Sequence, residues 1–173
     1  SKLDKFHRPR KIYKHFIGKP VESDKLVFEE KDETFTCSIG LTSDEKYFII
    51  STSDHITTEE HFFESISDEI KPRLFRKRKK DVRYSLDSWK SYFYVHTNQG
   101  ARDYKILRCK IDDIENLEEF IPSKKETVIG GLDFLDDYII RAEKSDAIPK
   151  LFVRNIQTNQ EEEIKVSNEP IGV

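Results

Sequence analysis

An internal repeat of about 45 residues constrains the fold more than any other feature of the sequence. Three short runs of aromatic and β-branched residues begin at Tyr47, Tyr92 and Tyr138, so the leading tyrosines are 45 and then 46 residues apart. Runs of this composition are typical of β-strands. The spacing therefore predicts that one strand-containing unit is repeated along the chain.

The same spacing recurs on both sides of these runs. Upstream, period-two alternation makes Leu41, Leu86 and Leu132 equivalent members of a first strand. Downstream, two further sets of apolar residues indicate a third and a fourth strand: Phe62, Ile106 and Phe152, then Phe75, Phe120 and Ile164. Clusters of turn-forming residues, such as 98–100, separate the strands. Each unit is thus predicted to contain four strands in a fixed order.

Four strands in roughly 40 to 50 residues is the size of one β-propeller blade, whereas solenoid repeats of this length are helical. The second strand of each unit is apolar on consecutive residues, which stacked blades explain because both of its faces are covered. A β-sandwich or a β-barrel is the alternative, but neither fold requires an internal sequence repeat. The sequence predicts an all-β fold, a partial β-propeller of about three and a half four-stranded antiparallel blades.

The repeat also divides the chain. We expect an N-terminal extension over 1–10 and a partial β-propeller domain over 11–173. Within the domain we expect a half blade over 11–33, with strands near 16–17 and 26–28, followed by full blades over 34–80, 81–122 and 123–166. Three and a half blades are too few to close a propeller ring of ordinary size. We therefore expect further sequence, and exposed strand edges, at one or both ends.

Composition argues against several classes of protein. The formal net charge is −3 with the two signs well mixed, which argues against nucleic acid and membrane surfaces as partners. No apolar run approaches the roughly 20 residues of a membrane span, and residues 1–10 lack the apolar core of a signal peptide. Cys37 and Cys109 belong to no metal-ligand pattern. We expect a cytoplasmic protein without a cofactor or metal.

Several segments together resemble the propeller of the prolyl oligopeptidase family, in its oligopeptidase B branch. The resemblance runs from Arg8 to Val166 and is most specific over 24–32. The other segments that carry it are 12–18, 56–59, 84–87, 93–94 with 97–98, and 118–122. They are spread over most of the chain.

The resemblance implies a seven-bladed propeller set over an α/β-hydrolase domain with a Ser, Asp and His triad. Such enzymes cleave short peptides after Arg or Lys, and the propeller restricts entry. The implied partners are a C-terminal hydrolase domain of the same protein and short basic peptides. This chain has no GxSxG-like elbow to present a nucleophile, so we expect it to carry no catalytic residue although its parent is a serine peptidase. A free-standing propeller that binds other proteins is the alternative.

An acidic cluster at the end of a predicted strand is the candidate site. Glu29, Glu30 and Asp32, with Glu33 beside them, could receive an Arg or Lys of a substrate or of a docking domain through bidentate hydrogen bonds. The competing interpretation is a solvated turn that discourages pairing at a sheet edge. The resemblance is strongest at this segment, which keeps the domain-facing role open.

Other polar groups have simpler explanations. The basic run over 73–80 could bind phosphates, but its place on an outermost strand favours protection of an open edge. His55, Glu59, Glu60 and His61 do not match the HExxH spacing, and strand alternation points Glu60 and His61 to opposite faces, which argues against a metal.

Two further positions are explained by packing. Trp89, at the turn after the first strand of its unit, is expected to fill a gap between blades. Gly130-Gly131 is expected to lie where a side chain is lost near the propeller axis.

Overall fold

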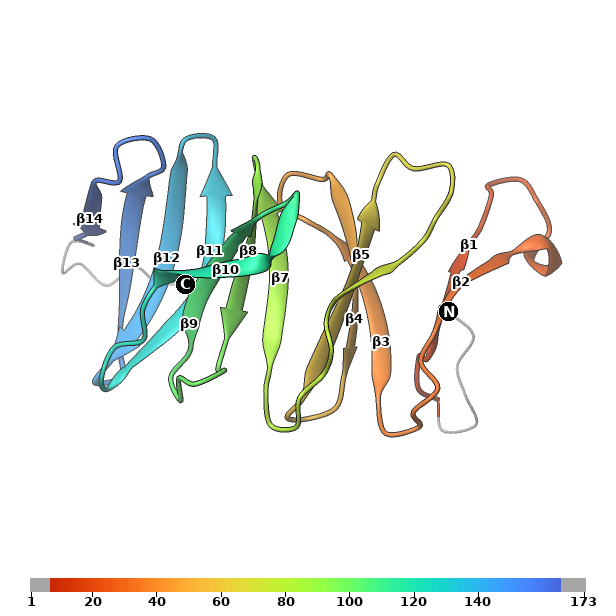
Figure 1. Ribbon diagram of the computed structural model, residues 1–173, viewed down its shortest axis with the longest axis horizontal. Coiled ribbons are helices and arrows are strands. Elements are labelled where there is room, and N and C mark those ends of the chain that lie inside the picture. Colours follow the sequence, from red (N-terminus) through yellow and green to blue (C-terminus); the bar gives the residue numbers. More distant parts are fainter. Residues whose placement is uncertain (1–6, 166–173) are drawn as a thin grey trace, which may run out of the picture.

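A computed structural model describes residues 7–165, in which nearly all regular structure is β-strand. The described strands form four antiparallel sheets that follow one another along the chain and lie in a row (Figure 1). The first sheet has two strands, β1 (Lys11–Lys14) and β2 (Lys25–Glu29), with the short 3-10 helix η1 (Val21–Ser23) between them.

Each of the other three sheets has four strands, and every strand pairs with its neighbours in sequence. The second sheet contains β3 (Thr36–Leu41), β4 (Tyr47–Ser53), β5 (Thr58–Glu64) and β6 (Arg73–Arg76). The third contains β7 (Tyr84–Trp89), β8 (Tyr92–Thr97), β9 (Lys105–Lys110) and β10 (Asp113–Ile121). The fourth contains β11 (Thr127–Leu135), β12 (Tyr138–Ser145), β13 (Ile148–Asn155) and β14 (Glu161–Ile164). The predicted all-β, partial propeller architecture is confirmed.

Consecutive apolar residues of the middle strands pack against different neighbours. Ile49 and Phe62 lie in one buried cluster with Phe93 of the next sheet. The adjacent residues Ile50 and Phe63 lie in another, against the two-stranded sheet. Since neighbouring strand residues point to opposite faces, both faces of this sheet are covered, as the apolar pattern of its second strand predicts.

The third and fourth sheets are joined in the same way. Tyr94 of β8 packs with Ile129, Phe134 and Ile139 of the fourth sheet, and all four side chains are buried. Burial of large apolar side chains on this scale contributes about 1.5–3 kcal/mol per side chain. The stacking of sheets is therefore the main source of stability.

The repeat spacing correctly predicts where the second strand of each four-stranded sheet begins. It misaligns the first strand of the second sheet. Tyr47, Tyr92 and Tyr138 do begin β4, β8 and β12. In the second sheet, however, the residue that occupies the position of Leu86 is Ile39, because Ile39 pairs with Ile50 as Leu86 pairs with Val95. The cause is the first hairpin loop, which has four residues (43–46) in the second sheet and two (90–91) in the third.

The strand expected near Phe16 and Ile17 is also misplaced. β1 ends at Lys14, and these two side chains are exposed in the connection to η1. The backbone N–H of Lys19 donates to the carbonyl of Phe16, and Gly18 has a φ of 83°, so the chain turns here. A left-handed residue of this kind favours glycine and ends the strand.

Gly130 has a different role from the expected one. The pairing of β11 with β12 shifts between Ile129 and Leu132, which is a β-bulge, and a Cβ at Gly130 would lie 2.7 Å from the carbonyl oxygen of Ala142. Gly130 is therefore required by the close approach of the neighbouring strand, whereas a Cβ at Gly131 would have no atom within 4 Å.

This difference predicts that Gly130→Ala lowers the free energy of unfolding by about 1–3 kcal/mol, because the β12 backbone must shift. Gly131→Ala is the matched control and should change it by less than about 0.5 kcal/mol. Urea unfolding of both variants measures the difference. Equal midpoints for the two would contradict this account of the bulge.

Candidate domain-facing site

The acidic segment lies where the chain leaves the two-stranded sheet and enters the first blade. Glu29 is the last residue of β2, and residues 30–35 connect it to β3. Two backbone bonds hold this crossing: the N–H of Glu30 donates to the Arg10 carbonyl, and that of Cys37 to the Pro9 carbonyl. The crossing is thus fixed in place by residues that precede β1.

The carboxylates of this segment have separate local partners. Glu29 forms an ion pair with Lys11 across the strand pair, at 3.0 Å, and this hydrogen bond and charge lower the pKa of Glu29. Asp32 accepts hydrogen bonds from the backbone N–H (2.9 Å) and hydroxyl (2.7 Å) of Thr34, which lower its pKa. Glu33 lies 3.8 Å from Arg10. The exposed carboxylates of this segment are therefore already engaged by partners close to them in the structure.

Glu30 differs from the others because it is buried, at 6% exposure, and paired with Arg78. The Arg78 guanidinium lies 2.5 Å from Glu30 and 3.1 Å from Glu59 of β5, and 4.0 Å from the centre of the Phe35 ring. Burial raises the pKa of Glu59, but the hydrogen bonds and charge of Arg78 outweigh this effect and hold it below its ordinary value. One cation therefore joins the two-stranded sheet to the first blade.

Sequence reasoning did not single out Arg78. It treated the run over 73–80 as protection of an edge, and β6 is indeed the outermost strand of its sheet. Arg78, however, lies beyond that strand and points inward, whereas Lys77, Lys79 and Lys80 are exposed and form no ion pair within the described residues. The available signal was weak, since nothing in a run of basic residues marks the one that is buried.

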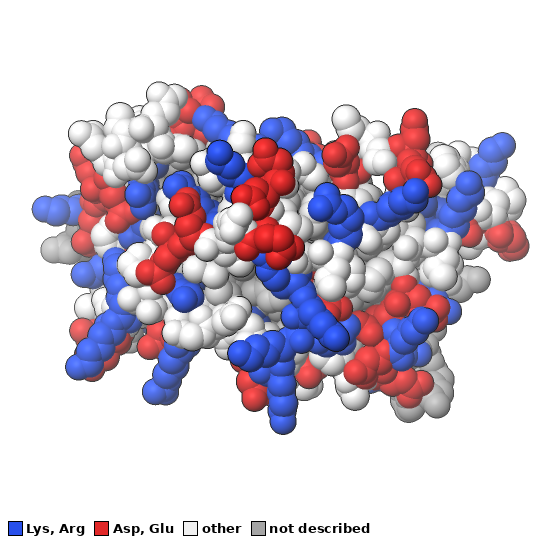
Figure 2. Space-filling model, viewed as in Figure 1, with Lys and Arg blue, Asp and Glu red and all other residues white. Residues whose placement is uncertain are grey.

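The charged side chains elsewhere are mixed. Figure 2 shows lysine and arginine interspersed with aspartate and glutamate over the visible face. In the described part of the chain, no helix has the length and apolar character needed to cross a membrane.

Glu60 and His61 point to opposite faces of their sheet, as strand alternation predicts. Glu60 faces the third sheet, where its backbone N–H donates to the Tyr84 hydroxyl at 2.9 Å, while the His61 ring lies 4.8 Å from the ring of Phe28 in the two-stranded sheet. Burial lowers the pKa of His61. Within residues 7–165, no three His, Cys, Asp or Glu side chains lie close enough to hold a metal ion.

Trp89 fills the contact between the third and fourth sheets. Its ring stacks on Phe134 with centroids 5.5 Å apart, and its indole N–H donates to the Asp136 carbonyl at 2.9 Å. The predicted role between blades is confirmed by these contacts.

Because Trp89 is the only tryptophan, its fluorescence reports on this contact. Phe134→Leu should shift the emission to longer wavelength and lower the free energy of unfolding by about 1 kcal/mol, since the stacked ring is lost. Leu135→Ala, at the next and exposed position, should leave the emission unchanged. An unchanged spectrum for Phe134→Leu would show that the ring does not shield Trp89.

One known protein family matches this chain over nearly its whole length. The family described as "Prolyl oligopeptidase, N-terminal beta-propeller domain" matches residues 2–171. Protease 2 of Moraxella lacunata is 27% identical over 87% of the chain, and dipeptidyl aminopeptidase BI of Pseudoxanthomonas mexicana is 26% identical over 83%. The chain spans 22% and 20% of the lengths of these two relatives.

Solved structures show the same fold. Oligopeptidase B from Trypanosoma brucei with covalently bound antipain superimposes with a TM-score of 0.87 at 21% identity, over 97% of this chain and 25% of that one. Oligopeptidase B from Leishmania major gives a TM-score of 0.87 at 19% identity, over 98% of this chain and 25% of that one. The repeat, the stacked sheets and the family match lead to one conclusion: this chain belongs to the prolyl oligopeptidase family, as a fragment of its N-terminal β-propeller domain.

Proposed function

We propose that this chain is the non-catalytic propeller portion of a serine oligopeptidase that cleaves short peptides after Arg or Lys in the cytoplasm. Its role is to restrict access to an α/β-hydrolase domain of the same polypeptide. The observation that carries the proposal is the family match over residues 2–171, together with relatives that are peptidases by name. No cofactor, nucleic acid or membrane is needed for this role.

The last sheet supports the presence of further blades. Its face away from the third sheet carries exposed apolar side chains, which share that face by their pairing: Leu135, Tyr138, Leu151 and Ile164. Their exposure ranges from 37% to 57%. An apolar sheet face of this kind is what another blade would cover.

Within this proposal, the acidic segment contacts the hydrolase domain or a basic peptide. Glu30 is already paired with Arg78, so the contact falls to the exposed carboxylates of Glu29 and Asp32. Both keep their charge at neutral pH because their pKa values are lowered, and either could exchange its local partner for an arginine.

The test compares hydrolysis of a short chromogenic peptide with an Arg or Lys before the scissile bond. The isolated chain should show no turnover, while the complete polypeptide should show turnover that a serine-directed inhibitor abolishes. Hydrolysis by the isolated chain would reject the proposal. So would a complete polypeptide that cleaves the same sequence equally well inside a folded protein, because the propeller would then not restrict access.

The acidic contact has its own test in the complete polypeptide. Reversing both charges, with Glu29→Arg and Asp32→Arg, should lower kcat/KM by about tenfold, as expected for loss of a charged contact. Glu64→Arg, at an exposed position of β5, is the control. Equal effects of the two changes would remove the assigned role from the acidic segment.

A further inference from the structure

Glu60 is an exception among the buried charges of this protein. Among residues 7–165, the buried charged side chains are Glu30, Glu59, Glu60, Arg141 and Glu143. Four of them form ion pairs: Arg78 with Glu30 and Glu59, and Arg141 with Glu143, to which Lys124 also binds at 2.7 Å. Glu60 is 2% exposed and forms no ion pair within the described residues. A buried carboxylate without a cation is costly, and such groups concentrate at functional sites.

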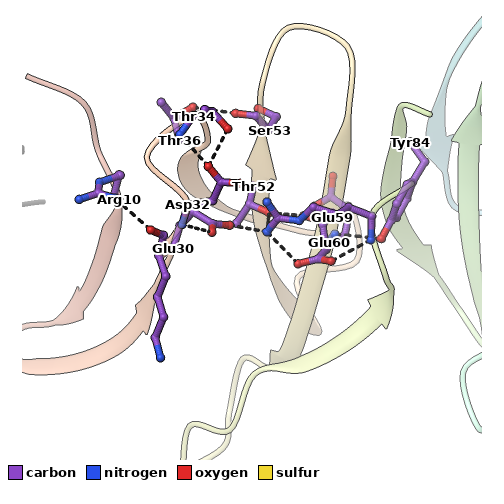
Figure 3. Close-up of polar contacts among 12 residues, drawn as sticks. Arg10, Glu30, Asp32, Thr34, Thr36, Thr52, Ser53, Glu59, Glu60 and Tyr84 are labelled. Carbon is purple, nitrogen blue, oxygen red and sulfur yellow. Dashed lines mark hydrogen bonds and ion pairs between the residues drawn. The ribbon is translucent and has the colours of Figure 1, made fainter. Parts of the chain in front are cut away.

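The Glu60 side chain lines a cavity at the edge where the second and third sheets meet. The cavity has a volume of about 290 Å³ and follows β7, the edge strand of its sheet. Ser51, Ser53 and Glu60 of the second sheet line one side of it, and Ser85 and His96, on the face of β7 and β8 that is turned to the fourth sheet, line the other. Glu60 and Tyr84 lie together in Figure 3, at the contact of the second and third sheets. The size suits a small molecule rather than a chain segment.

Hydroxyl groups make up much of the cavity wall. Ser51 donates a hydrogen bond to one Glu60 oxygen at 2.6 Å. Ser53 and Ser85 also line the cavity, and their hydroxyls make no hydrogen bond to other described residues. Thr58 is already engaged, since its hydroxyl accepts from the Tyr84 N–H and donates to the Tyr84 carbonyl. One Glu60 oxygen and the serine hydroxyls therefore remain as acceptors.

These acceptors match an ammonium group. An ammonium has three N–H donors and no acceptor, and a carboxylate with nearby hydroxyls satisfies all three. A divalent metal fits poorly, because no second carboxylate lines the cavity.

Arg83 narrows the choice of ligand. It lines the same cavity, is exposed, and forms no ion pair within the described residues. A simple cation would be repelled by Arg83, whereas a ligand with a carboxylate near its ammonium would pair with both groups. His96 is the other lining side chain that could carry a positive charge, while Tyr84 and Tyr104 also line the cavity and burial raises the pKa of Tyr84. Burial lowers the pKa of His96, and its Nε2–H donates to the Ile129 carbonyl at 2.7 Å. His96 is therefore neutral and adds no charge.

We propose that this cavity binds a small zwitterion, a free amino acid or dipeptide, with its ammonium on Glu60 and its carboxylate on Arg83. The inference goes beyond the proposed function, because restricting access to a hydrolase domain requires no such site. It can therefore fail while the proposed function stands, and the reverse also holds.

Binding should depend on pH in a defined way. Burial raises the pKa of Glu60 to about 8, so the empty site holds a proton at neutral pH. An ammonium favours the carboxylate and displaces this proton, so affinity should rise as the pH approaches about 8. Above that value affinity should fall, because the α-amino group of the ligand loses its own proton near the same pH.

The test is an NMR titration of this chain with alanyl-alanine, its N-acetyl derivative and its C-terminal amide at about pH 8. The free dipeptide should shift the amides of Ser51, Tyr84 and Ser85. Acetylation should weaken binding by about tenfold or more, and Glu60→Gln should do the same. Arg83→Gln should weaken binding of the free dipeptide by about threefold or more, and it should leave binding of the C-terminal amide derivative unchanged.

Glu64→Gln, an exposed change on the same strand, is the control and should bind as the unmodified protein does. Glu60→Gln keeps the hydrogen bond from Ser51, so a folded variant is expected, and its amide spectrum verifies this. The proposal is overturned if the acetylated peptide binds equally well or if Glu60→Gln has no effect. It is also overturned if about 10 mM dipeptide, tenfold above a millimolar Kd, causes no saturable shift.

Discussion

Replacing Arg78 with methionine will lower the free energy of unfolding by about 3–5 kcal/mol, because two buried carboxylates lose the cation that both of them pair with. Glu30 and Glu59 are 6% and 8% exposed, and both depend on the same guanidinium. Urea unfolding at neutral pH measures the loss. The free energy of unfolding of Arg78→Lys should lie between those of Arg78→Met and the unmodified protein. Lysine keeps the positive charge but loses the forked geometry and the contact with the Phe35 ring.

Two further observations make this prediction specific. Lys77→Met, one residue away and exposed, should change stability by less than about 0.5 kcal/mol. The loss in Arg78→Met should shrink as the pH falls toward about 5, because protonation neutralises the unpaired carboxylates. Hydrogen exchange should accelerate in β1 and β2 before it does in the fourth sheet. A loss that is equal in all sheets and insensitive to pH would contradict the assigned role.

Replacing Glu60 with glutamine will make the protein more stable, by an amount that grows with pH. Burial raises the pKa of Glu60 to about 8, above its ordinary 4.5, so the unfolded chain releases this proton first. Between these two values the folded state binds one more proton than the unfolded state, and stability falls by about 1.4 kcal/mol per pH unit. Glutamine does not titrate and is free of this loss.

The measurement is the difference in unfolding free energy between Glu60→Gln and the unmodified protein. The difference should increase by about 4 kcal/mol from about pH 5 to pH 8, and then become constant. Other titrating groups contribute equally to both proteins and cancel. Glu64→Gln should show no such trend, because that side chain is exposed. A difference for Glu60→Gln that does not vary with pH would show that Glu60 is not desolvated.

The fold could be predicted because its evidence is local. Tyr47, Tyr92 and Tyr138 begin strands whose composition identifies them one at a time, and their spacing depends only on the length of each unit. The first strands were harder to align. Ile39, not Leu41, is the equivalent of Leu86, because the length of a hairpin loop is not visible in strand composition.

The site depends on contacts between distant residues, which the sequence does not reveal. Glu30 and Arg78 are 48 residues apart, and only the folding of the first blade brings them together. Glu60 lies among polar residues in sequence, and its burial follows from the sheet that stacks on it. Local patterns therefore predict strands well, but they cannot identify which charge becomes buried.

Face-to-face stacking of successive blades is the claim on which the fold, the ion pair of Arg78 and the cavity of Glu60 all depend. It is tested most directly by nuclear Overhauser effects between aromatic rings of different sheets. The account predicts strong cross-peaks between Phe62 and Phe93, whose ring centroids are 5.0 Å apart, and between Trp89 and Phe134. Cross-peaks confined to rings of the same sheet would contradict it.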